Sequence, residues 1–292
     1  MIITFPDGSK KSYDQGVTPY DIAYGISQSL AKNAIGAKIN EDFVELNRKL
    51  YEDATLSIIT KKDEDALYFL RHSTAHLMAQ AILSLYPQAN FGVGPVINEG
   101  FYYDVDVEGQ TLTDEDLETI EKKMRALSAE QFDIVREEVT YEKAKQLFAH
   151  DPYKLEIIEQ YKDSQLSVYR QGDFVDLCRG GHVKNTSDIK HFKLLSLAGA
   201  YWRGDANNKM LTRIYGTSFY TDDALKAYLN ILEERKARDH RKIGKALNLF
   251  MTSKDSGAGL PFWLPKGATV RRVIERYITD KELELGYEHV YT

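Results

Sequence analysis

The side chains in this sequence that are best suited to chemistry form two pairs, and both pairs have the same four-residue spacing. Residues 72–76 read His-Ser-Thr-Ala-His, and residues 178–182 read Cys-Arg-Gly-Gly-His. Two histidines four residues apart lie on one face of a helix. The second pair follows a predicted strand, where two successive glycines allow a tight loop. The candidate site residues are therefore His72, His76, Cys178 and His182.

Two chemistries fit this set of side chains. Three imidazoles and one thiolate are ordinary ligands of Zn²⁺, but four protein ligands close the coordination shell, whereas a hydrolytic zinc needs an open position. Without a metal, the histidines could act as general bases on a water molecule. Lys154, and Asp176 two residues before Cys178, could hold a phosphate, an amine or that water.

Each of these signals also has a plainer interpretation. A histidine pair in a buried helix is often only hydrogen-bonded core. Lys154 and Asp176 could be ordinary surface residues that form ion pairs. The occurrence of two reactive pairs in one chain favours a functional site over this interpretation.

The first pair needs a long helix to position it, and the sequence predicts one from about residue 64 to 86, where Pro87 ends it. Two apolar stripes along this helix indicate that it is covered on two sides. A further helix begins after Thr113. Alternating or apolar runs predict strands near residues 91–96, 101–107, 132–139, 166–169, 174–177, 193–197 and 210–215. Together these elements predict an α+β domain that ends near residue 220.

The first 60 residues predict a separate, ubiquitin-like β-grasp unit. An Asp-Gly turn at residues 7–8 lies between two short strands. Thr18, Pro19 and Asp21 form the capping box of a helix whose apolar residues continue through Ile26 to Leu30. Three more strands follow near residues 35–39, 43–46 and 55–59. No catalytic arrangement is visible here, so we expect an accessory or docking module.

The last 70 residues predict a connector followed by the start of another domain. One long helix is expected from Asp222 to about Asn248, and a basic run occupies its second half: Arg235, Lys236, Arg238, Arg241, Lys242 and Lys245. This run is either a local nucleic-acid patch or the solvated face of an exposed helix. A helix is expected at about residues 269–285, and residues 286–292 resemble a strand that has only just started. We expect a third domain that is cut short.

Composition narrows the class of protein. With 43% hydrophobic residues in 292, a sizeable core can form, and a single cysteine excludes an internal disulfide framework. The net charge of −6 argues against extensive wrapping of nucleic acid, which usually needs a basic face. No secretory signal or membrane-spanning run is visible. A cytoplasmic protein is expected.

Five motifs, in order and with matching spacing, resemble bacterial threonyl-tRNA synthetases. They are residues 71–76, residues 94–97 leading to 100–104, and residues 176–182, 199–205 and 213–217. The resemblance extends over essentially the whole chain. One departure is Gly181, where the family usually has proline. That difference could loosen the loop that holds His182, although it removes no reactive group.

The resemblance implies a multidomain α+β protein. Its parts are a TGS domain (residues 1–61), an editing domain (62–222), a linker helix (223–242) and the beginning of a class II catalytic domain (243–292), cut off in the motif 1 region. The full-length enzyme would attach threonine to tRNA(Thr) using ATP and Mg²⁺, with a zinc in its catalytic domain. It would be a homodimer through that domain, while the portion here would hydrolyse mischarged seryl-tRNA(Thr).

The resemblance also implies roles for single residues. His72 and Lys154 would activate and position water, and His76, Cys178 and His182 would line the pocket. Asp176 would bind the seryl amine, and Tyr103 would shape the wall. It implies an editing site that works without zinc, although the four-residue cluster could bind the metal. The alternatives are a free-standing, zinc-dependent editing protein of the alanyl type and a non-catalytic RNA-binding module.

Overall fold

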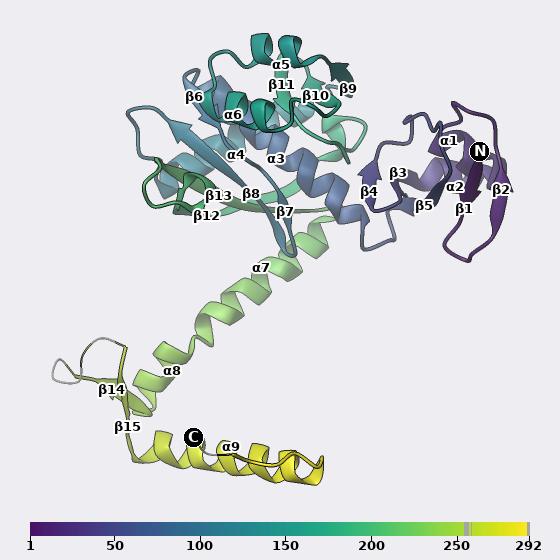
Figure 1. Cartoon of the computed structure of the whole chain (residues 1–292). Coiled ribbons are helices and arrows are strands. Elements are labelled where there is room, and N and C mark those ends of the chain that lie inside the picture. The colour runs from purple at the N-terminus through teal and green to yellow at the C-terminus, as the bar shows by residue number, and fades with distance from the viewer. Residues whose placement is uncertain (254–256, 258, 291–292) are drawn as a thin grey trace. The chain divides into compact units, whose positions relative to one another are not determined.

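The computed structural model describes residues 1–253, 257 and 259–290 (Figure 1). The chain divides into two compact units, Met1–Leu225 and Lys226–Thr292. The first unit contains the candidate site.

The N-terminal part of the first unit is a five-stranded sheet with two short helices. Strand order is β2-β1-β5-β3-β4, from β1 (Ile2–Thr4), β2 (Lys10–Ser12), β3 (Ala34–Ile39), β4 (Asp42–Val44) and β5 (Ala54–Thr60). The predicted capping box opens α1 (Pro19–Ile26). The helix does not continue to Leu30 as predicted, because Ser27 caps a new helix, α2 (Gln28–Asn33). Ile26 is consequently 52% exposed instead of lying on the core stripe.

The centre of the unit is one long helix on a sheet. Helix α3 (Ala66–Leu85) and helix α4 (Asp114–Ala129) pack against each other and against the sheet. The strand order of this central sheet is β12-β13-β8-β6. The strands are β6 (Ala89–Phe91), β8 (Gly100–Val107), β12 (His191–Tyr201) and β13 (Met210–Phe219), and a short strand, β7 (Val96–Ile97), also pairs with β8. The predicted strand at 91–96 is therefore two short strands. From Ser73 to Ile82 every residue of α3 is buried, which confirms that the helix is covered on two sides.

A second, smaller sheet holds the other half of the site. Strands β9 (Ile134–Val139), β10 (Leu166–Gln171) and β11 (Phe174–Leu177) pair in the order β11-β10-β9. Between β9 and β10 lie α5 (Tyr141–Leu147) and α6 (Pro152–Gln160). These helices and strands share an apolar cluster of their own, which includes Phe148, Ile158 and Val168. The 178–182 loop leaves the end of β11.

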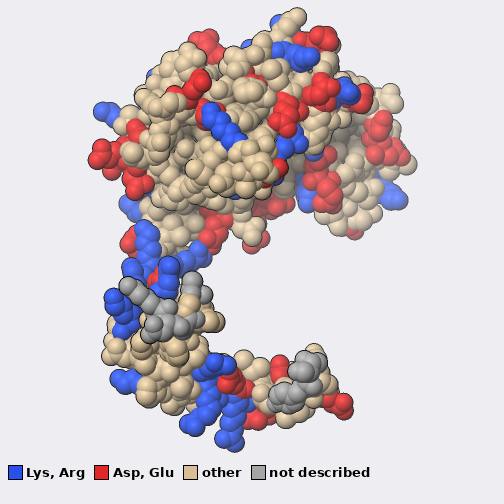
Figure 2. All heavy atoms as spheres, turned by 60° about the vertical axis from the view of Figure 1, so that its left-hand side comes forward, with Lys and Arg blue, Asp and Glu red and all other residues tan. Residues whose placement is uncertain are grey.

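Beyond the first unit, the predicted single connector helix is wrong. The structure has α7 (Asp222–Ala237) and α8 (His240–Ala246), because the side chain of Asp239 accepts a hydrogen bond from the Arg241 backbone N–H and so caps a new helix. The basic side chains gather there (Figure 2). Lys236, Arg238 and Arg241 pair with nearby acids, as expected for a solvated helix face.

The segment after α8 also differs from the prediction. A hairpin of β14 (Phe250–Thr252) and β15 (Pro261–Trp263) precedes α9 (Pro265–Glu284). Residues 286–290 do not form the predicted strand, and residues 291–292 lie outside the described part. Strand geometry is held by hydrogen bonds to a neighbouring strand, and no described strand pairs with this segment. Among the described helices, none combines the length and the apolar character that crossing a bilayer requires.

Candidate functional site

The four candidate ligands converge in one cluster. His72 and His76 come from successive turns of α3, and Cys178 and His182 come from the loop after β11. Cys178 Sγ lies 3.2 Å from His72 Nε2 and 3.3 Å from His182 Nε2. The His182 ring lies 4.2 Å from that of His72 and 4.4 Å from that of His76, centroid to centroid. We call these four residues the imidazole–thiol cluster.

Two glycines shape the loop that brings Cys178 and His182 to the helix. Gly180 and Gly181 have φ angles of +126° and +85°, which residues with a side chain rarely adopt. A Cβ on Gly181 would lie 2.6 Å from the ring of Tyr68. Proline, which the resembling family usually has here, is fixed near φ −65° and cannot adopt this backbone. The backbone of this loop therefore requires glycine, not proline, at position 181.

Ser73, between the two histidines, sets the tautomer of His182. Its hydroxyl donates to the Phe69 carbonyl over 2.8 Å, and it accepts from the Val183 N–H. Ser73 Oγ also lies 3.1 Å from His182 Nδ1. Because its only proton is already used, the proton between them belongs to Nδ1. His182 Nε2 is therefore unprotonated, and its lone pair faces the Cys178 thiol.

This tautomer propagates to His72. The Cys178 thiol can donate its one proton to the lone pair of His182 Nε2, and Sγ then accepts from His72 Nε2–H. This arrangement satisfies all three groups, whereas the reverse leaves His182 Nε2 unpaired. His72 Nδ1 is then an acceptor, and it is buried without a hydrogen-bond partner among the described residues. His76 Nδ1 is likewise buried without a partner among the described residues, so the geometry leaves unpaired nitrogens on two histidines that could accept a proton from water.

Burial keeps the cluster uncharged at neutral pH. It lowers the pKa of His72 and of His182, and lowers that of His76 to about 3, with Asp176 opposing the shift in His76. Burial raises the pKa of the Cys178 thiol. Neutral imidazoles can act as bases, and a protonated thiol is a poor nucleophile. The histidines of this cluster are therefore in the uncharged form that can accept a proton or bind a metal ion.

Beside the cluster lies a second set of buried residues, Lys154, Asp176 and Tyr103, which we call the charged group. Lys154 Nζ lies 2.5 Å from Asp176 Oδ1 and donates to the Tyr103 hydroxyl over 2.8 Å. Tyr103 donates to Asp176 Oδ2 over 2.5 Å. Lys154 and Asp176 are only 3% and 2% exposed, so the interpretation as surface ion-pair residues is wrong.

Asp176 stays ionised because its neighbours together compensate for burial. Burial alone would raise the pKa of Asp176, but Lys154, His76 and the hydrogen bonds from Lys154 and Tyr103 together outweigh it, so the pKa is lowered. Burial and the Asp176 carboxylate together raise the pKa of Tyr103, which keeps its proton. His76 Nε2 lies 3.6 Å from Asp176 Oδ2 and joins the two groups.

A helix N-terminus positions the lysine. Lys154 is in the first turn of α6, whose N-cap Asp151 accepts from the backbone N–H groups of Tyr153 and Lys154. Its other carboxylate oxygen accepts from the Phe91 N–H in β6 over 2.7 Å. This cap therefore ties the start of α6 to the central sheet and directs Lys154 at β11.

The donor types of the cluster fit a zinc ion. The four potential ligand atoms lie within 4.8 Å of one another. Histidine ligands usually donate their second ring N–H to a neighbouring acceptor. Only His182 does so, through Ser73, because the Nδ1 atoms of His72 and His76 have no partner among the described residues. A zinc held by all four side chains would have a closed shell and would supply structural stability.

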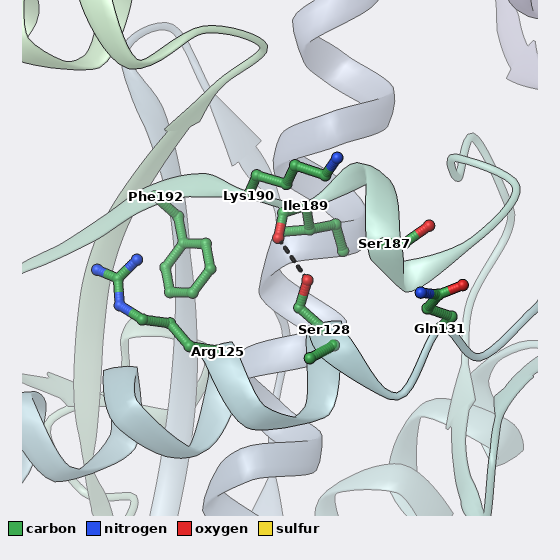
Figure 3. Close-up of a pocket in the computed structure, with 8 residues that line it drawn as sticks. Arg125, Ser128, Gln131, Ser187, Ile189, Lys190 and Phe192 are labelled. Carbon is green, nitrogen blue, oxygen red and sulfur yellow. Dashed lines mark hydrogen bonds between the residues drawn. The ribbon is translucent and has the colours of Figure 1, made fainter.

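Two surface hollows elsewhere in the first unit share no residue with the cluster. One lies between the end of α4 and the segment leading into β12 (Figure 3). There the Arg125 guanidinium lies 4.8 Å from the Phe192 ring centroid, and Ser128 donates to the Ile189 carbonyl. Ser128 links the end of α4 to the segment before β12, and Arg125 packs on Phe192. The polar groups of this hollow therefore have structural roles.

The structure brings together all seven residues singled out in the sequence. The sequence reasoning missed Ser73, although its place between the two histidines was a usable signal. It also missed Tyr169, whose ring centroid lies 4.5 Å from that of His182, and Glu45, which contacts the loop from the N-terminal sheet. No local pattern marks either residue, because both reach the site only through tertiary contacts.

Comparison with known proteins agrees with this architecture. The family model of the TGS domain matches residues 1–60, and the model described as "Threonyl and Alanyl tRNA synthetase second additional domain" matches residues 166–215. The threonine–tRNA ligase of Acholeplasma laidlawii (strain PG-8A) is 62% identical over 290 residues, which are 99% of this chain and 45% of that protein.

The threonine–tRNA ligase of Staphylococcus carnosus (strain TM300) is 57% identical over 291 residues, again 99% of this chain and 45% of the relative. The chain thus spans less than half the length of the curated relatives it matches. The predicted α+β class with TGS and editing-associated domains is confirmed. Over 99% of its length this chain is similar to threonine–tRNA ligases, and parts of it match the TGS domain and the second additional domain of threonyl and alanyl tRNA synthetases.

Proposed function

We propose that this chain carries an editing site that hydrolyses the ester bond of seryl-tRNA(Thr). The observation that carries the proposal is the unpaired, neutral nitrogen of His72, in a cluster whose His76 lies 3.6 Å from the carboxylate of the buried Lys154–Asp176 pair. The match to a domain described for threonyl and alanyl tRNA synthetases supports it. Editing is needed because a pocket that binds threonine cannot fully exclude serine. The one methyl group by which they differ gives only about 1–3 kcal/mol of discrimination.

In the proposed reaction, His72 Nδ1 takes a proton from a water molecule as its oxygen attacks the seryl carbonyl carbon. The bond to the ribose oxygen breaks, and that oxygen receives the proton that His72 took from the water, which leaves free serine and the 3′-terminal hydroxyl of the tRNA. Lys154 would position the water or the carbonyl oxygen. Asp176 would bind the ammonium group of the seryl ester in place of the Lys154 ammonium. Tyr103 would form the wall of the pocket. His76, Cys178 and His182 would line the pocket for the seryl group.

This reaction needs no metal. If zinc binds, His72, His76, Cys178 and His182 would hold it, and it would supply structural stability. With zinc on its Nε2 atom, the neutral His72 ring would carry its proton on Nδ1. That nitrogen would then be unavailable as a base. Sensitivity to chelators therefore separates metal-free editing from a structural zinc site.

We also propose that the whole protein attaches threonine to tRNA(Thr) using ATP and Mg²⁺, as the names of its relatives indicate. Residues 1–61, 62–222, 223–242 and 243–292 would be the TGS domain, the editing domain, the linker and the start of the class II domain. That last domain would bind a zinc and form the homodimer. The partner would be tRNA(Thr), in the cytoplasm.

The test is hydrolysis of Ser-tRNA(Thr) and Thr-tRNA(Thr) by this chain and by His72→Ala. We expect cleavage of the seryl ester only, with a rate lowered about 100-fold or more in the variant, as for loss of a general base. His150→Ala is the matched control, because His150 is exposed. Equal cleavage of both esters, or full activity in His72→Ala, would contradict the proposal.

A further inference from the structure

One residue of the N-terminal domain reaches the loop of the site. Glu45 directly follows β4, and its Oε1 atom accepts from the backbone N–H groups of Gly181 (2.9 Å) and His182 (3.2 Å). The same oxygen accepts from the Tyr169 hydroxyl over 2.8 Å. A single carboxylate oxygen thus collects donors from the 178–182 loop and from β10.

The surrounding contacts hold this carboxylate in place. Phe43, on β4, stacks on Tyr68 of α3 with ring centroids 4.2 Å apart. The second oxygen of Glu45 is buried and has no hydrogen-bond partner among the described residues. Burying part of a carboxylate without a cation beside it is costly unless hydrogen bonds compensate. The three donors supply that compensation.

We propose that Glu45 is a positioning residue of the editing site: its carboxylate fixes the 178–182 loop so that Cys178 and His182 face α3. The inference rests on the proposed editing function for its catalytic consequence. Gly181 is part of the mechanism, because its backbone N–H is one of the donors and a proline there would have none. The N-terminal domain then contributes directly to the order of the site.

The first experiment measures the order of the loop without using hydrolysis. Cys178 is the only cysteine in the sequence, so the rate of its alkylation by iodoacetamide reports on this loop alone. In Glu45→Ala we expect labelling at least about tenfold faster than in wild type, from the loss of hydrogen bonds to a charged acceptor. In Glu45→Gln, which keeps one acceptor oxygen, labelling should stay near the wild-type rate.

Matched controls separate loop release from unfolding. Glu41→Ala removes another glutamate next to β4, one that pairs with Lys38 on the surface, and should label like wild type. Circular dichroism verifies the fold of each variant. If Glu45→Ala does not fold, amide exchange of the wild-type chain decides, because the N–H groups of Gly181 and His182 must then be protected. Exchange at the rate of a free loop would overturn the proposal.

The second experiment tests the catalytic consequence. Hydrolysis of Ser-tRNA(Thr) by Glu45→Ala should show kcat reduced about tenfold or more with KM little changed, as expected for a disordered site with intact substrate contacts. Faster labelling with unchanged kcat would overturn the positioning role. Wild-type chain that hydrolyses no ester would refute the proposed function, while unchanged labelling in Glu45→Ala would refute the role of Glu45.

Discussion

Two sets of buried side chains meet at the contact between His76 and Asp176, the imidazole–thiol cluster on one side and the charged group on the other. In the cluster, burial suppresses charge, since it lowers the pKa values of the histidines and raises that of the thiol. In the charged group, Lys154 keeps the pKa of Asp176 low in spite of burial. The same low-dielectric interior therefore yields a neutral base beside an ion pair.

The difference lies in the partners, not in the depth of burial. His76 and Asp176 are 3% and 2% exposed. Asp176 has a cation and a hydroxyl donor at hydrogen-bond distance. Among the described residues, the charged partner of His76 is a carboxylate at 3.6 Å, beyond a normal hydrogen bond. A site that needs both a neutral base and fixed charges can thus be built in one interior.

The largest effect in this comparison should come from breaking the charged group. Asp176→Asn leaves the ammonium of Lys154 buried without its carboxylate, and the free energy of unfolding should fall by about 3–5 kcal/mol. Urea unfolding at pH 7.5 measures it. Adding Lys154→Met should restore part of the loss, because the unpaired charge is gone.

A matched control for this prediction is the exposed pair of Glu159 and Lys162. Glu159→Gln should leave the urea midpoint unchanged, since exposed pairs contribute little. If Asp176→Asn shifts the urea midpoint as little as Glu159→Gln does, the buried ammonium of Lys154 does not depend on the Asp176 carboxylate for its stability.

An intermediate effect should come from acid, and it should act on the cluster first. The folded pKa values of His72, His76 and His182 lie below the ordinary value of 6.5, so the unfolded chain binds more protons once the pH falls below 6.5. Stability is full above pH 6.5 and decreases below it, by up to about 1.4 kcal/mol per histidine at pH 5.5.

The charged group should not contribute in that range. The folded pKa of Asp176 is lowered from 3.8, so its stabilisation persists above 3.8 and is lost only as the pH falls further. Urea midpoints of wild type and His76→Gln between pH 7.5 and 5.5 test this, and the variant should show a shallower decline. Equal slopes would mean that His76 is not held neutral by the fold.

The smallest effect is expected from metal removal. A cluster that acts through a free imidazole should keep its thermal midpoint and its seryl-ester hydrolysis in excess EDTA. A fall of the midpoint on chelation, reversed by Zn²⁺, would instead identify a structural zinc site, because such sites contribute their binding energy to folding. Apo and zinc-loaded melting curves measure the difference.

Much of the fold and the site could be predicted because the signals are local. The His-Ser-Thr-Ala-His motif lies on a helix with two apolar stripes, and both the helix and its covered faces are confirmed. Capping boxes at Thr18 and Thr113 mark helix starts where the structure has them. The predictions that failed nearby had readable causes too, since Ser27 and Asp239 each cap a new helix inside a predicted continuous one.

The sequence by itself determined which reactive side chains exist, their spacing along helix and loop, and the resemblance of five motifs to a known family. Tertiary structure alone decided that Lys154 and Asp176 are buried together, that Ser73 sets the tautomer of His182, and that Glu45 reaches the loop from another domain. Periodicity and capping reflect forces between residues a few positions apart. Burial, and hydrogen bonds across more than 100 residues such as that from Gly181 to Glu45, exist only once the chain has folded.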